Sequence, residues 1–148
     1  TDEVTENSIT NDVTDTLITK KIVDNLVTKD NEFVIYELTE ALGQKNSDKS
    51  IKILDSMSKE QGLLGLIVNH FRRLFFIATS GLENKDLANL LGVKEYAIAK
   101  QRSQTINFSK MQLKKIYSLL EEIDFNIKSG AMLQENALYY LVLSILYI

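Results

Sequence analysis

From residue 31 onward, apolar residues recur every three or four positions, which is the spacing of one face of an α-helix. Stretches of alternating apolar and polar residues long enough for a β-strand are absent from the sequence. The pattern therefore predicts an all-α helical bundle. Its expected helical segments are 20–27, 31–43, 47–62, 63–81, 84–91, 94–105, 109–129 and 133–148.

Residues that begin and end helices stand at the borders of these segments. Asn31 and Ser47 are expected to cap helix N-termini, because their side chains accept hydrogen bonds from free backbone N–H groups. Gly43, Gly62 and Gly130 are expected to end helices. The chain has six glycines and no proline, which favours helices joined by short turns over a β-sandwich.

The composition removes several kinds of chemistry. The 148 residues include no cysteine and one histidine, His70, so thiol nucleophiles and cysteine-ligated zinc are excluded. Neither a serine hydrolase motif nor a phosphate-binding loop is present. His70 lies in a mostly apolar segment, where a packed side chain is the ordinary interpretation. We therefore expect no catalytic residue and no cofactor.

Charge is uneven along the chain. Residues 1–17 hold five acidic and no basic residues, while the rest holds 17 basic and 15 acidic ones. We interpret 1–29 as an acidic segment followed by the last helix of a preceding helical domain, and 30–148 as the main domain. The longest apolar run, 137–148, is shorter than the roughly 20 residues of a membrane span, so a cytoplasmic protein without membrane contact is expected.

Two helices are too apolar to have one buried face and one solvated face. Segment 63–81 has a core stripe, and its other side also carries apolar residues together with an arginine. The last segment is rich in tyrosine. Such helices lie either in the centre of a domain or at an interface with a partner. The candidate interface residues are Leu66, Arg73, Phe76, Ile77, Tyr139, Tyr140 and Tyr147.

Charged residues beside the apolar stripes suggest an ion pair between helices. Asp124 precedes Lys128 by four positions, the favourable order for a pair within a helix. Arg72 lies at the edge of its own stripe, where a partly buried charge needs a partner. We expect Arg72 to meet Asp124 across two packed helices, with Lys128 as a second counter-charge; the alternative is that all three are solvated.

Residues 85–105 resemble a helix-turn-helix, which offers an alternative function in DNA binding. Leu87, Ala88 and Leu91 would pack inward and Gly92 would form the turn. The residues facing a DNA groove would be Lys94, Glu95, Lys100, Gln101 and Arg102. However, residues 83–110 carry only five basic against three acidic groups, a small surplus for phosphate binding.

Four motifs in order resemble one protein family. These are "NEFVIYELTEAL", "FRRLFFIATSGL", "LANLLGV" and "INFSKMQLKKIYSLLEEIDFNIKSG", followed by an apolar helix. Over residues 18–148 they are similar to the C-terminal part of the delta subunit of the bacterial DNA polymerase III clamp loader.

The resemblance implies a role in DNA replication. It implies that the segment to about Lys29 is the tail of a lid domain and that 30–148 is a helical collar domain. Collars of this family pack with those of the ATPase and delta-prime subunits, and delta itself does not hydrolyse ATP. The sliding clamp would be bound by an N-terminal domain that has no counterpart in this sequence. Any contact of this chain with DNA would be indirect. The chain would thus be a non-catalytic part of a nucleotidyltransferase assembly.

Overall fold

The computed structural model describes residues 31–57 and 62–148. The chain divides into two compact units, Thr1–Val34 and Ile35–Ile148, and the fold described below is that of the second. Three predictions lie outside the described residues. They are the acidic segment 1–17, the helix 20–27 and the domain boundary at residues 29 and 30. That boundary stays a prediction.

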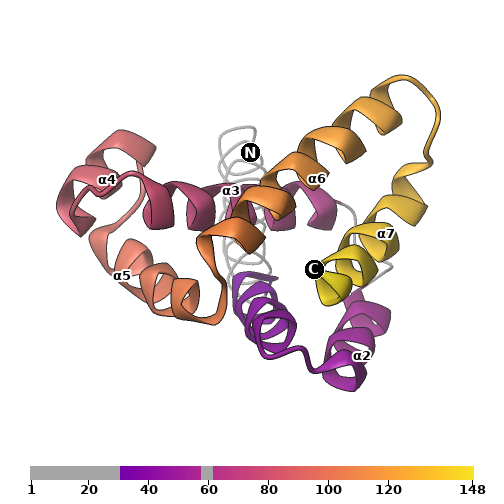
Figure 1. The fold of residues 1–148 in the computed structure, drawn as a ribbon, viewed down its shortest axis with the longest axis horizontal. Coiled ribbons are helices and arrows are strands. Elements are labelled where there is room, and N and C mark those ends of the chain that lie inside the picture. The colour runs from indigo at the N-terminus through magenta and orange to yellow at the C-terminus, as the bar shows by residue number, and fades with distance from the viewer. Residues whose placement is uncertain (1–30, 58–61) are drawn as a thin grey trace, which may run out of the picture. The chain divides into compact units, whose positions relative to one another are not determined.

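The described residues form helices and turns, and none of them lies in a β-strand. Residues 31–43 are helical. The elements that follow are α2 (Ser47–Met57), α3 (Leu63–Thr79), α4 (Asn84–Leu91), α5 (Glu95–Gln104), the short 3-10 helix η1 (Thr105–Asn107), α6 (Lys110–Lys128) and α7 (Gln134–Tyr147). Figure 1 shows their arrangement. The predicted all-α bundle is confirmed.

Helix α3 is the central element of the unit. It packs against α6 and α5, while α4 pairs with α5, and α7 packs against both α6 and α2. Its core face is filled by large side chains that are almost completely buried, namely Leu63, Ile67, Phe71 and Leu74. The apolar stripe read from the sequence is therefore the surface on which the bundle is built.

Helix α6 begins and ends where the sequence predicts. The Ser109 hydroxyl accepts a hydrogen bond from the Gln112 backbone N–H at 3.1 Å, and the Gln112 side chain accepts one from the Ser109 N–H at 2.8 Å. This reciprocal capping box satisfies two free donors of the first turn. Gly130, with φ of 79°, follows the C-terminal end in the left-handed conformation that favours glycine.

The end of the helix formed by residues 31–43 differs from the prediction. Lys45, not Gly43, takes the left-handed conformation, with φ of 57°. The N–H groups of Asn46 and Lys45 donate to the carbonyls of Ala41 and Leu42 at 2.9 and 3.1 Å, which is the Schellman pattern.

The start of α2 is likewise shifted by one residue. The Asn46 side chain, not that of Ser47, accepts the capping hydrogen bond, from the Lys49 N–H at 3.1 Å. Asn and Ser have similar preferences as N-caps, so the sequence does not decide between neighbours.

Gly43 has a different role, which is to let two elements approach closely. A Cβ atom added there would lie 2.5 Å from the Cβ of Asn107 and 3.3 Å from the ring of Phe108. The backbone of the helix at residues 31–43 therefore packs directly on the segment that leads into α6. A glycine inside a helix, which costs about 1 kcal/mol relative to alanine, is retained here for space.

We expect Gly43→Ala to lower the free energy of unfolding by about 1–3 kcal/mol, because the new methyl group overlaps Asn107. Gly65→Ala in α3 is the matched control, since a Cβ there meets nothing within 4 Å. That variant should be unchanged or more stable, by up to about 1 kcal/mol. Urea titration followed by circular dichroism measures the unfolding free energy of both variants. Equal changes in the two variants would contradict the close approach of Gly43 to Asn107.

Candidate functional site

The outward side of α3 is only partly exposed. Leu66 and Arg73 are half-buried, and Phe76 has 43% of its surface exposed. Ile77, in contrast, is buried at 2% exposure in a cluster with Leu87 and Ile98. Ile77 therefore belongs to the core of this unit, and its prediction as an exposed interface residue was wrong. The α4–α5 pair covers this part of α3, which the periodicity of α3 alone does not reveal.

Phe76 belongs to an aromatic cluster formed by Phe75, Phe76 and Tyr117, where α3 crosses α6. The Phe75 ring stacks on Tyr117 with centroids 4.7 Å apart, and Phe76 meets Tyr117 edge-on at 6.5 Å. Neighbouring rings hold Phe76 in place while much of its surface remains in solvent. A rigid, exposed aromatic residue of this kind is typical of an interface anchor.

A second apolar surface runs along α7. The tyrosine stripe, formed by Tyr139, Tyr140, Leu143 and Tyr147, has exposed fractions of 37%, 40%, 42% and 90%. The opposite side of the same helix is buried in the core through Ala137, Leu141, Val142 and Ile145. Helix α7 thus presents apolar side chains both to the bundle and to solvent. The sequence left a central position and an interface open for this helix, and the interface stays a prediction.

Two of these tyrosines are oriented by carboxylates from neighbouring helices. The Tyr139 hydroxyl donates to Asp55 Oδ1 of α2 at 3.2 Å, and Tyr140 donates to Glu122 Oε1 of α6 at 3.2 Å. The hydrogen bond to Glu122, followed by the negative charge of that carboxylate, raises the pKa of the Tyr140 phenol. The rings are therefore held at their outer ends, which reduces the conformational entropy lost on binding a partner.

The predicted ion pair between helices is not formed. Among the described residues, the one ion pair within 4.0 Å joins Lys128 Nζ and Asp124 Oδ2 at 2.8 Å inside α6. Their side chains are 75% and 50% exposed, so the pair contributes little stability. Arg72 is half-buried on α3 and does not reach Asp124. Asp124 points to solvent, where its own helix supplies the nearest cation.

The structure also contains a groove that the sequence did not indicate. It lies between α6 and α7, has a volume of about 480 Å³, and is lined by Met111, Lys114, Lys115, Ser118, Leu119, Glu122, Tyr140, Ser144 and Ile148. The residues from α6 repeat at helical spacing along one side of that helix. The sequence of α6 therefore shows a face with mixed polar and apolar residues. This face becomes one wall of a groove only because α7 packs beside α6.

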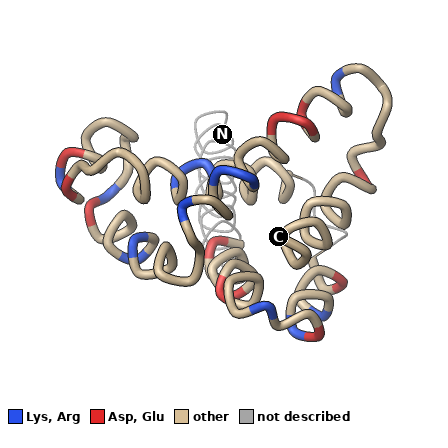
Figure 2. The backbone as a smooth tube through the Cα atoms, in the orientation of Figure 1, with Lys and Arg blue, Asp and Glu red and all other residues tan. Residues whose placement is uncertain are grey.

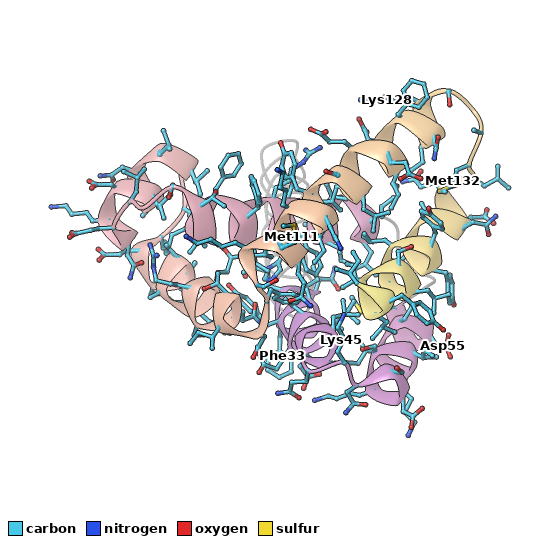
Figure 3. All side chains as sticks on the ribbon, in the orientation of Figure 1. Phe33, Lys45, Asp55, Met111, Lys128 and Met132 are labelled. Carbon is cyan, nitrogen blue, oxygen red and sulfur yellow. The ribbon has the colours of Figure 1, made fainter. Side chains whose placement is uncertain are left out.

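Lys45 fixes the C-terminal end of α7. Its ammonium group donates to the carbonyl oxygens of Ile145 at 2.8 Å and Leu146 at 3.3 Å, and Figure 3 shows the side chain beside that helix. Partial burial lowers the pKa of Lys45. A cation at a helix C-terminus interacts favourably with the helix dipole and with carbonyls that lack partners. The contact orients the tyrosine stripe relative to the bundle.

The helix-turn-helix interpretation loses two of its proposed DNA-reading residues. Gln101 is completely buried, and its Nε2 donates to His70 Nδ1 at 2.9 Å. Arg102 donates to Asn84 Oδ1 at 2.7 Å and to the Leu82 carbonyl at 2.8 Å. These side chains hold α5 against α3 and α4, so they do not form part of a free recognition surface.

The described residues offer neither a metal site nor a membrane-spanning helix. Within the ranges that the structure describes, no cluster of three or more histidine or acidic side chains is placed to hold a metal ion. None of the helices described is both long and apolar enough to cross a membrane.

Residues 32–145 match the family described as DNA polymerase III delta subunit, C-terminal domain. The chain belongs to this family. The resemblance inferred from the four motifs is thereby confirmed. The search of curated proteins gave no match.

A solved structure agrees with this assignment at the level of the fold. The delta C-terminal domain described here is similar to the Bacillus subtilis DNA clamp loader delta protein, with a TM-score of 0.69 and 24% sequence identity. The likeness covers 80% of this chain and 37% of that one, so the chain spans well under half the length of its relative. The family and the fold both support the delta assignment, and nothing found supports the helix-turn-helix alternative.

Proposed function

We propose that this delta C-terminal domain is a collar that joins the subunits of a DNA polymerase III clamp loader. It would pack with the ATPase and delta-prime subunits in the cytoplasm and would support loading of the sliding clamp during DNA replication. Binding of the clamp itself would belong to another part of the delta subunit, and contact with DNA would be indirect. The domain would contribute structure to the polymerase assembly and no catalytic residue.

The observation that carries this proposal is the exposure of apolar residues on two surfaces of an otherwise filled bundle. One is Phe76 in the aromatic cluster with half-buried Leu66 and Arg73 nearby on α3, and the other is the tyrosine stripe of α7. Interfaces are enriched in aromatic residues and arginine. A collar subunit has neighbours on two sides, which agrees with two such surfaces.

The direct test is to measure the mass of complexes by size-exclusion chromatography with light scattering. The chain is run alone and then with the ATPase and delta-prime subunits from the same organism. We expect a defined complex containing the delta chain. If partners that are demonstrably folded do not associate with it, the collar proposal fails.

Substitutions in the two surfaces should weaken this association without unfolding the domain. We expect Phe76→Ser and Tyr147→Ser each to reduce affinity for the loader subunits at least about tenfold, because aromatic anchors dominate interface energies. Tyr96→Ser in α5 is the matched control, since Tyr96 is 69% exposed and belongs to neither surface. Equal affinity for all three variants would show that these surfaces are not the contact.

A further inference from the structure

The groove between α6 and α7 has an apolar floor and oppositely charged ends. Leu119, Met111 and the ring of Tyr140 supply apolar lining. Lys114 and Lys115 lie towards one end, and Glu122 lies further along the same helix. Figure 2 shows the order of charges along α6, with basic positions in its first half, acidic positions beyond them and one further basic position, Lys128, in the last turn.

The spacing of these charges corresponds to two helical turns. Glu122 follows Lys115 by seven residues and Lys114 by eight, which places the charges about 11 Å apart along the axis at 1.5 Å per residue. Ser118 lies between them on the side of α6 that lines the groove. Two turns of another helix have the same length, so a helix laid along α6 would meet both ends.

The charges at the groove have no ionic partner among the residues that the structure describes. Among residues 31–57 and 62–148, neither lysine has a carboxylate within 4.0 Å, and Glu122 accepts a hydrogen bond from Tyr140. Lys114, Lys115 and Glu122 are all exposed. The groove therefore offers separated charges of both signs around an apolar centre.

We propose that this groove receives an amphipathic helix from a neighbouring clamp-loader subunit and that its charges fix the direction of that helix. An acidic residue of the incoming helix faces Lys114 and Lys115. A basic or amide side chain about seven positions away faces Glu122, and apolar side chains between them contact Leu119 and Tyr140. This inference rests on the collar function proposed above and defines the chemistry of one contact.

Glu122 favours a protein helix over nucleic acid as the occupant. A phosphate backbone carries negative charge along its whole length, so it would gain from the lysines but be repelled at Glu122. A helix with charges of both signs matches both ends. The reverse orientation of the same helix places like charges together at each end, which discriminates against it.

The test compares affinities of charge variants for the purified ATPase and delta-prime subunits, measured by biolayer interferometry at two salt concentrations. We expect Lys114→Glu combined with Lys115→Glu to weaken binding at least about tenfold and to reduce its salt dependence. The matched control is Lys85→Glu with Lys94→Glu, which makes the same charge change on exposed residues at the α4–α5 pair, well away from α7 in Figure 1. That control should bind like the unmodified chain.

A second variant blocks the groove without changing its charge. Ser118→Trp places an indole on an exposed position of the lining and should also weaken binding at least about tenfold. Thermal melts of each variant establish that the domain is folded.

The outcomes separate the two proposals. If the unmodified chain binds but the Lys114/Lys115 and Ser118 variants bind equally well, the groove proposal is overturned while the collar function stands. If the unmodified chain does not bind, both fail. If the lysine variant loses affinity for single-stranded or duplex DNA and keeps its affinity for the loader subunits, the groove is a nucleic-acid site and the helix proposal is wrong.

Discussion

Phe71→Ala is expected to lower the free energy of unfolding by about 3–5 kcal/mol, the range for removing a buried aromatic ring from a core. Phe71 is 1% exposed and lies at the centre of α3. Its ring meets those of His70 and Phe108 edge-on at 6.0 and 6.1 Å. The substitution removes the ring contact between α3 and Phe108, which lies in the segment leading into α6, and it leaves a cavity that neighbouring helices cannot close without moving. Urea titration with circular dichroism detection measures the loss.

Phe76→Ala is the control for this prediction, because it removes the same ring from the same helix at an exposed position. Phe76 retains 43% of its surface in solvent, and its ring meets Phe75 and Tyr117 in the outer aromatic cluster. Its loss should cost about 1 kcal/mol, at most about a third of the loss at Phe71. If the two variants were equally destabilised, the assignment of these residues to a core face and an outer face would be incorrect.

The second large effect is expected in mild acid and is due to His70. The imidazole is 3% exposed, and burial, with a further contribution from the positive charge of Arg73, lowers its pKa to about 4. Gln101 donates to Nδ1, and Nε2 donates to Gln104 Oε1 at 3.1 Å, so both ring nitrogens are satisfied in the neutral form. The Gln104 amide then donates to the Tyr36 carbonyl at 3.0 Å, which extends the network to the helix of residues 31–43.

The direction of the pH effect follows from these protonation states. Unfolded histidine binds a proton with a pKa of 6.5, while folded His70 remains neutral until about pH 4. Between these values the unfolded state binds more protons, so stability falls as the pH is lowered. The stability that the neutral His70 side chain contributes is fully present above pH 6.5. It is lost as the pH falls towards 4. At 1.36 kcal/mol per pH unit, the loss amounts to about 3 kcal/mol.

The measurement compares unfolding free energies of the unmodified chain and His70→Gln from pH 7 to pH 4. Glutamine retains hydrogen bonding to the neighbouring amides but does not titrate. The variant should be less stable at pH 7, and the difference between the two proteins should shrink by about 3 kcal/mol as the pH falls. Carboxylates that titrate in this range contribute to both proteins and cancel. If the unfolding free energies of the two proteins changed in parallel with pH, a buried neutral His70 would be contradicted.

Local sequence signals predicted the helices themselves with good accuracy. The bounds of α4 at Asn84 and Leu91 agree with the prediction, as do Ser109 and Gly130 at the two ends of α6. These signals lie within one or two turns of the feature they specify. The order of the motifs also identified the family, because several local helix signals follow one another at fixed separations along the chain.

Features that depend on which helices meet were not predictable in the same way. The stripe of α3 shows two apolar sides, but only the position of the α4–α5 pair makes Ile77 a core residue and leaves Phe76 exposed. Similarly, the edge positions of Arg72 and Asp124 were compatible with contact, yet the packing of α3 on α6 does not join them. Gln101 looked like a surface residue until α5 brought it to His70, and the groove required the pairing of α6 with α7.

The lysine cap on α7 has a consequence for how this domain is made. Lys45 is separated from Ile145 by 100 residues, so the contact cannot form until nearly the whole domain has left the ribosome. Helix α7 is therefore fixed late, after the α4–α5 pair, whose contacts are local in the sequence, has had time to assemble. Until α7 docks, its apolar side chains are exposed on the nascent protein, and such surface promotes aggregation unless a chaperone or a binding partner covers it.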